Sequence, residues 1–278
     1  MKKFNVGIQL YGLKNTLKED FEGTLAKVAE MGYEYVEFAG YYGKTAEEIL
    51  AVLEKYGLKC ISVHQKLDWF DEDPIGKINY LKAFGCKYVV VPYHSADLLA
   101  GTPEWDNTVA LFNKYATLFG QHGMVLGYHN HDFEYRVYEG KYLLDYITEC
   151  VPAGLIVPEL DTCWVNYGGA PVTEEIAKYA GRLPIIHLKD FVCTKRGGSV
   201  YELIATDGSV SGKRSRAEDG FEYRPVGSGM QNIGEILTAA EAAGTETVIV
   251  EQDSVYGDMT ELEAAELSRK YLKETFGI

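Results

Sequence analysis

The chain has 278 residues, of which 46% are hydrophobic and 24% charged, and its formal net charge is −14 at pH 7. Such a composition indicates a soluble globular protein with an ample core. No segment approaches the roughly 18 to 20 apolar residues that a membrane-spanning helix needs, so we expect no membrane partner. The negative charge disfavours a nucleic-acid partner, because it repels a phosphate backbone.

The cysteines predict a reducing compartment. They are scattered along the chain, odd in number and without a Cys-x-x-Cys pair: Cys60, Cys86, Cys150, Cys163 and Cys193. This pattern favours free thiols and argues against a thiolate metal site. The N-terminal apolar stretch is also too short and too interrupted for a secretory signal, so we expect a cytoplasmic protein.

Strand-like and helix-like segments alternate throughout the chain. Eight segments have the length and apolar pattern of strands: 4–11, 33–39, 59–65, 87–92, 124–128, 155–160, 183–188 and 247–250. Apolar residues at helical spacing mark a second set of segments: 17–31, 46–56, 74–84, 102–121, 142–149, 172–179, 233–243 and 260–276. Gly32 and Gly57 stop two of these helices, and Thr45 with Glu48 forms a capping box before 46–56.

This alternation predicts a single α/β domain over residues 1–278. Parallel strands need helical crossovers of this length, and eight such units close into a (β/α)8 TIM barrel. The chemistry of such a barrel lies at the C-terminal ends of its strands. A doubly wound open sheet is the alternative, but Gly7 and Gly12 lack the spacing of a phosphate-binding loop.

One long loop, 190–229, interrupts the rhythm after the seventh strand. Residues 201–205 and 209–211 flank an Asp207-Gly208 turn, which predicts a β-hairpin. The loop carries the basic patch of an acidic chain: Lys195, Arg196, Lys213, Arg214 and Arg216. It could be a lid, an anion clamp, a contact in a homo-oligomer or a solvated loop.

Four candidate metal ligands end four consecutive predicted strands: His129, Asp161, His187 and Glu251. In a barrel, each strand end contributes one inward side chain to a shared site. A lone His at a strand end is commonly a structural, hydrogen-bonded residue, but the combination favours a metal. Two imidazoles and two carboxylates suit one divalent ion, Mn, Co, Zn or Fe, with Mg as a further candidate.

Other residues near the strand ends are candidates for binding a carbohydrate. Residues two apart share a face of a strand, so His131 and Glu159 lie beside His129 and Asp161. Lys189 suits a substrate oxygen or carboxylate, or pairs with an acid at the barrel rim. The candidates for contacting substrate are His64, Glu37, His131, Tyr11, Trp164 and Lys189. A structural hydrogen bond or core packing explains any single one of them equally well.

Five short blocks together resemble a known family. They are Gly32-Tyr33-Glu34-Tyr35-Val36-Glu37, Tyr128-His129-Asn130-His131-Asp132, Leu160-Asp161-Thr162, His187-Leu188-Lys189-Asp190 and Val250-Glu251-Gln252-Asp253. From about Val6 onward the chain resembles the xylose-isomerase-like barrel superfamily, and within it the sugar phosphate isomerase/epimerase group. Relatives in that superfamily include ketose 3-epimerases, inosose dehydratases and endonuclease IV.

The resemblance implies a divalent metal on His129, Asp161, His187 and Glu251. Two positions depart from the family pattern. His129 stands where ketose epimerases have a Glu that also serves as acid and base. Trp164 stands where many relatives have a His. Glu134 falls near a carboxylate that contacts substrate in the family.

The resemblance also implies an enzyme that isomerises or epimerises a sugar, keto-sugar or sugar phosphate. A proton next to the carbonyl would be removed through a metal-stabilised enediolate. Glu251 is the expected base, with Glu159, Glu134 or Lys189 as the returning acid. The alternative is a dehydratase or lyase acting on a keto-sugar or keto-polyol. A non-catalytic sugar-binding barrel is weaker, and six His with a charge of −14 disfavour a phosphodiesterase like endonuclease IV.

Overall fold

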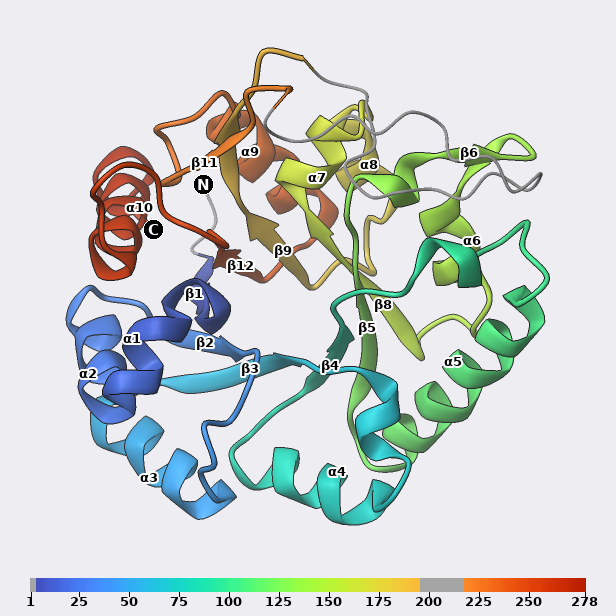
Figure 1. Cartoon of the computed structure of the whole chain (residues 1–278), viewed down its shortest axis with the longest axis horizontal. Helices are drawn as coiled ribbons and strands as arrows, with labels where there is room; N and C mark the ends of the chain where they lie inside the picture. Colours follow the sequence, from blue (N-terminus) through green and yellow to red (C-terminus); the bar gives the residue numbers. More distant parts are fainter. Residues whose placement is uncertain (1–3, 196–217) are drawn as a thin grey trace.

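The computed structural model describes residues 4–195 and 218–278. Within these ranges eight parallel strands close into a barrel at the centre of the molecule (Figure 1). Its strands are β1 (Asn5–Gln9), β2 (Tyr35–Phe38), β3 (Lys59–His64), β4 (Tyr88–Val91), β5 (Val125–His129), β8 (Ile156–Asp161), β9 (Ile185–Leu188) and β12 (Thr247–Val250). Each lies within two residues of a predicted strand or inside it, so the TIM-barrel prediction is confirmed.

Helices form an outer ring around the barrel (Figure 1). They are α1 (Lys14–Glu19), α2 (Phe21–Glu30), α3 (Ala46–Tyr56), α4 (Pro74–Ala83), α5 (Trp105–Gln121), α6 (Leu143–Glu149), α7 (Thr162–Tyr167), α8 (Val172–Lys178), α9 (Ile233–Ala243) and α10 (Glu261–Phe276). The main apolar core lies between these helices and the strands. In the described part of the chain, no helix combines the length and apolar character needed to cross a membrane.

Two helical segments differ from the prediction. The segment 17–31 is two helices, because Asp20 has an extended backbone and its carboxylate accepts a hydrogen bond from Gly23 N at 2.9 Å. Asp20 therefore caps α2 and ends α1. Helix α7 was not predicted; it begins directly after β8, where Asp161 caps it.

The two ends of the predicted loop after strand seven pair with each other. They form the antiparallel strands β10 (Asp190–Val192) and β11 (Glu222–Arg224). The buried Asp190 carboxylate accepts hydrogen bonds from Gly227 N at 3.0 Å and Gln231 N at 3.1 Å. Asp190 thereby ties the beginning of the loop to its end.

The predicted hairpin at 201–211 lies outside the described residues. Four of the five residues of the predicted basic patch lie outside them too: Arg196, Lys213, Arg214 and Arg216.

Side chains of two kinds fill the barrel interior. Tyr88, Val90, Ile185 and Ile249 form an apolar cluster. Polar residues near the strand ends lie above it, and a β-bulge between β2 and β3 helps to place them. Pairing shifts by one residue after Val36, so Glu37 lies opposite Ser62 and Ile61 is left without a partner in the register.

The remaining short elements are η1 (Leu10–Leu13), η2 (Leu67–Phe70), η3 (Ala96–Leu98), η4 (Phe133–Tyr135), β6 (Val137–Tyr138) and β7 (Lys141–Tyr142).

Candidate active site

The four predicted metal ligands converge at one end of the barrel. His129 ends β5, Asp161 ends β8, His187 lies in β9 and Glu251 follows β12. Each offers one ligand atom, and these atoms all lie within 4.8 Å of one another. All four side chains are buried. The alternation of neighbouring strands therefore brings the predicted set together as expected.

The distances between the ligand atoms of these four residues are short enough for the atoms to bind one ion. His187 Nδ1 lies 2.7 Å from Glu251 Oε2. His129 Nε2 lies 3.7 Å from Asp161 Oδ2 and 4.0 Å from Glu251 Oε2. The other oxygen of Asp161, Oδ1, accepts hydrogen bonds from the backbone N–H groups of Cys163 (2.8 Å) and Trp164 (3.3 Å). The cap of α7 thus fixes the direction of Asp161 Oδ2.

Lys189 places a cation against the carboxylates. Its Nζ lies 2.8 Å from Asp161 Oδ2, 2.9 Å from Glu251 Oε2 and 3.2 Å from Asp253 Oδ2. Burial disfavours the charged ammonium, but these carboxylates outweigh it and raise the pKa of Lys189 well above its usual value. Lys189 therefore stays a cation and neutralises part of the carboxylate charge in the protein.

The arrangement fits a divalent ion. Among the described side chains, the buried atom Asp161 Oδ2 makes no hydrogen bond of good geometry, although Lys189 Nζ lies 2.8 Å away. Such atoms are costly to bury, and ligation is one way to satisfy them. Nitrogen and oxygen donors without a thiolate suit Mn, Fe, Co or Zn. His129, Asp161, His187 and Glu251 are the residues that would hold the ion.

The pKa shifts describe a set with distinct charge states. Burial lowers the pKa of His129 well below its usual value, so this ring is neutral near pH 7. Burial opposes ionisation of Glu251, but Lys189 and His187 outweigh it and hold its pKa well below the usual range. Burial raises the pKa of Asp161 to about 6 in spite of Lys189. At neutral pH the set therefore offers two ionised carboxylates and the neutral imidazole of His129.

His64 lies beside this set, as a candidate for contacting substrate should. Its Nε2 lies 2.8 Å from Glu159 Oε2 and 3.0 Å from Glu37 Oε1. Burial disfavours the imidazolium, but Glu37 and Glu159 outweigh burial and raise the pKa of His64 to about 10. His64 is therefore a cationic donor at neutral pH.

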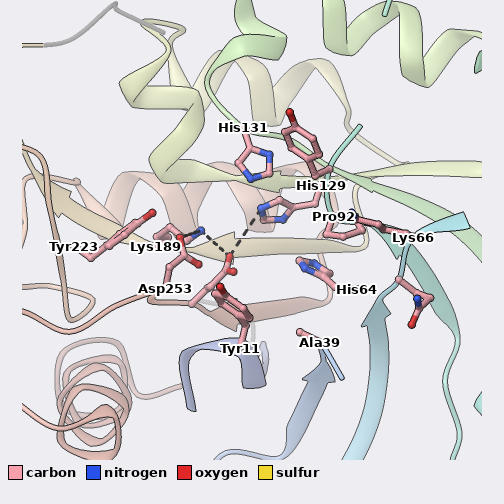
Figure 2. A pocket seen from close by; sticks show the side chains of 13 residues that line it. Tyr11, Ala39, His64, Lys66, Pro92, His129, His131, Lys189, Tyr223 and Asp253 are labelled. Carbon is pink, nitrogen blue, oxygen red and sulfur yellow. Dashed lines mark hydrogen bonds and ion pairs between the residues drawn. The ribbon is translucent and has the colours of Figure 1, made fainter. Parts of the chain in front are cut away.

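A cavity of about 570 Å³ opens above the cluster. Its walls are Tyr11, Ala39, His64, Gln65, Lys66, Pro92, Tyr93, His129, His131, Lys189, Tyr223, Glu251 and Asp253. Figure 2 shows Lys189, Tyr223 and Asp253 on one side of this cavity and His64 and Lys66 on the other. The predicted substrate contacts Tyr11, His64, His131 and Lys189 thus line a space of the size of a small-molecule site.

Two predicted site carboxylates do not line this cavity. Glu37 is fully buried and accepts a hydrogen bond from Gln9 Nε2 at 2.6 Å, so it is closed to substrate. Glu159 lies two residues before Asp161 and is 1% exposed, one level deeper in the barrel. Alternation predicted the face of Glu159, and a position near a strand end suggested Glu37, but neither observation predicted their depth.

Glu134 and Trp164 also lie outside the cavity wall. Glu134 is fully buried and accepts hydrogen bonds from Tyr128 Oη at 2.7 Å and His131 N at 2.8 Å. The Trp164 ring stacks on Phe221 with 5.5 Å between centroids, because α7 turns it toward the segment before β11. Neither residue is placed to contact substrate.

Several wall residues were missed by sequence reasoning. Gln65 ends the predicted strand 59–65 and Lys66 follows it, but neither was singled out as a site residue. Tyr223 comes from β11, and no pattern in the sequence indicated that this strand returns to the barrel mouth.

Comparisons with known proteins agree with this architecture. A family model described as xylose isomerase-like TIM barrel matches residues 25–275. The chain is 26% identical over 188 residues to an inosose dehydratase of Geobacillus kaustophilus, a match that spans 60% of either chain. It is 24% identical over 291 residues to an inosose dehydratase of Clostridium perfringens, covering 95% of this chain and 91% of that enzyme.

Solved structures share the fold along almost the whole chain. A sugar phosphate isomerase/epimerase from Parabacteroides distasonis superposes with a TM-score of 0.75 at 21% identity, covering 99% of this chain and 96% of that one. The IOLI protein, whose crystal structure has a binding zinc atom, gives 0.67 at 15% identity and 97% coverage of both chains. From its barrel and its matching sequence over residues 25–275, this chain belongs to the xylose isomerase-like TIM barrel family.

Proposed function

We propose that the protein is a metal-dependent sugar isomerase or epimerase that removes a proton next to a substrate carbonyl. The observation that carries this proposal is the convergence of His129, Asp161, His187 and Glu251 beneath a polar cavity. Family membership supports it, because the relatives and neighbours described above carry the names of sugar isomerases, epimerases and dehydratases.

The position of each residue in the site suggests its role in this reaction. A bound divalent ion would polarise the carbonyl oxygen and acidify the neighbouring C–H bond. Glu251 is the base: it is ionised at neutral pH, lines the cavity, and accepts the proton from carbon on its carboxylate. Lys189 keeps that carboxylate oriented from 2.9 Å away. His64, His131 and Lys66 are placed to bind hydroxyl groups of the substrate.

Dehydration of a keto-polyol is the second candidate. Elimination needs a base for the carbon-bound proton and an acid for the departing hydroxyl. Glu251 would be the base and the imidazolium of His64 the acid, and both line the same cavity. Symmetric epimerisation instead suits two like carboxylates, and here His129 occupies one of the strand ends involved. The likeness to inosose dehydratases supports the same candidate.

Proton exchange in deuterated water tests both candidates. The zinc- or manganese-loaded protein is incubated with a panel of ketoses, aldoses and inososes. Deuterium at the carbon next to the carbonyl of recovered sugar supports isomerase or epimerase chemistry, and loss of water identifies a dehydratase. Glu251→Gln should abolish either signal. Tight binding of a sugar without exchange across the panel would contradict the proposal and favour a non-catalytic sugar-binding barrel.

A further inference from the structure

We infer that Glu159 and Glu37 are positioning residues that make His129 and His187 bind the ion through opposite ring nitrogens. His129 would use Nε2 and His187 would use Nδ1. This inference rests on the proposed metal centre and goes beyond it, because it assigns the role of two buried carboxylates outside the cavity wall.

His129 lies between two sets of oxygens. Its Nε2 faces the metal-ligand carboxylates, at 3.7 Å from Asp161 Oδ2 and 4.0 Å from Glu251 Oε2. Its Nδ1 faces the other way, at 3.2 Å from Glu159 Oε2. A neutral imidazole carries one N–H, so a proton on Nδ1 directed at Glu159 leaves the Nε2 lone pair for the ion.

His187 has the reverse orientation. Its Nδ1 lies 2.7 Å from Glu251 Oε2, on the side of the metal-ligand set. Its Nε2 lies 2.9 Å from Glu37 Oε1 and 3.2 Å from Glu159 Oε2. The same reasoning puts the proton of a metal-bound His187 on Nε2 and the ligand lone pair on Nδ1.

Both positioning carboxylates are held firmly by other groups. Glu37 accepts hydrogen bonds from Gln9 Nε2 at 2.6 Å and from the hydroxyl of Ser62. Glu159 Oε2 lies 2.8 Å from His64 Nε2, and its backbone is paired with that of His129 across β8 and β5. A carboxylate behind a metal-bound imidazole fixes the tautomer and the ring orientation, and raises the basicity of the ligand.

A second reading of the same residues predicts a different result. His64, His129, Glu159 and His187 also offer ligand atoms within 4.8 Å of one another and could hold an ion of their own. In that reading the nitrogens that face Glu159 would bind metal instead of carrying protons. The two readings therefore differ in stoichiometry and in which nitrogens are protonated.

The first test is the tautomer of each ring in the zinc-loaded full chain. The protein is labelled with ¹⁵N-histidine, long-range ¹H–¹⁵N spectra are recorded, and His129 and His187 are assigned by single His→Gln variants. We expect one zinc per chain, with the proton on Nδ1 of His129 and on Nε2 of His187. The inference is overturned if either ring binds the ion through its other nitrogen, or if the wild-type chain holds two ions.

The second test measures zinc affinity by competition with a chelator. Glu159→Gln and Glu37→Gln keep the side-chain shape, and each should weaken zinc binding roughly 10- to 100-fold with the stoichiometry still one. Asp145→Asn is the control, because Asp145 is also buried but its carboxylate bonds Tyr179 and Lys178 instead of a metal-ligand histidine. It should change zinc affinity less than about 2-fold.

The outcomes separate this inference from the proposed function. Unchanged affinity in both glutamine variants, with zinc still bound, refutes the positioning role and leaves the metal centre standing. A wild-type chain that binds no zinc or manganese refutes the metal centre and the inference together.

Discussion

Glu134 is a carboxylic acid buried beside the barrel, and it makes stability depend on pH. Burial raises its pKa to about 8 although Tyr128 and His131 donate to it. An unfolded carboxyl titrates near about 4.3, so between these values the folded chain holds a proton that the unfolded chain lacks. Its contribution is therefore complete at low pH and lost as pH rises toward 8.

We expect Glu134→Gln to reduce this pH dependence. Urea unfolding at pH 5.5 and pH 8.0 should show a smaller loss of unfolding free energy in the variant than in the parent. An equal loss in both proteins would mean that Glu134 is ionised in the folded state.

Lys189 is the residue whose loss should cost most in the metal-free protein. Lys189→Met leaves three carboxylates, Asp161, Glu251 and Asp253, without their shared cation. Removing one partner of a buried ion pair costs about 3–5 kcal/mol. Zinc should restore more stability to the variant than it adds to the parent. Lys114→Met, which breaks an exposed pair with Asp71, is the control and should reduce stability far less, because solvent screens this pair.

The positions of residues along the strands were enough to predict which side chains meet at the site, but not their hydrogen-bond partners. His129, Asp161, His187 and Glu251 each lie at or next to the C-terminal end of a strand, so the fold brings them together. Glu37 has the correct face but bonds to Gln9, which ends a different strand 28 residues earlier. Such a partner depends on barrel closure and register, and a single sequence does not show either one.

At the scale of elements, the β10–β11 pair depends on one carboxylate. Asp190 also accepts from Phe191 N at 2.9 Å and Gly229 N at 2.9 Å, besides Gly227 and Gln231. Asp190→Ala should cost about 3 kcal/mol or more, because buried N–H groups lose their acceptor. Hydrogen exchange at 227–231 should accelerate in Asp190→Ala and less in Asp190→Asn, which keeps one oxygen. Equal protection in all three proteins would contradict this role.

Helix boundaries were predictable where neighbouring residues in the sequence form the cap. The capping box of Thr45 and Glu48 is present as predicted, with Thr45 Oγ1 accepting from Glu48 N at 3.2 Å. Helix α7 escaped prediction because Asp161 serves two purposes, as a cap through Oδ1 and as a candidate ligand through Oδ2.

For the whole molecule, the proposed metal centre predicts a coupling between ion binding and unfolding. An ion that binds only the folded state at 100 times its Kd stabilises by about 2.7 kcal/mol. Thermal melts with zinc should therefore exceed melts with a chelator, and the double variant Asp161→Ala with His187→Ala should show no difference. Zinc that stabilises the double variant as much as the parent would place the ion elsewhere.

The bulge in β3 determines where this strand tolerates a change of length. Cys60 packs in the layer between strands and helices, so strict alternation would turn His64 to that layer as well. Ile61 packs with the barrel interior, and Ser62 bonds the inward-facing Glu37, so two consecutive residues face inward. After this bulge the alternation is shifted by one residue, and His64 faces inward. Deleting Ile61 should straighten the strand and keep His64 facing the cavity. Deleting Val63 should turn His64 away from the site, because the residue after Ser62 faces outward. The site would then lose His64 although the sequence still contains all of its polar residues.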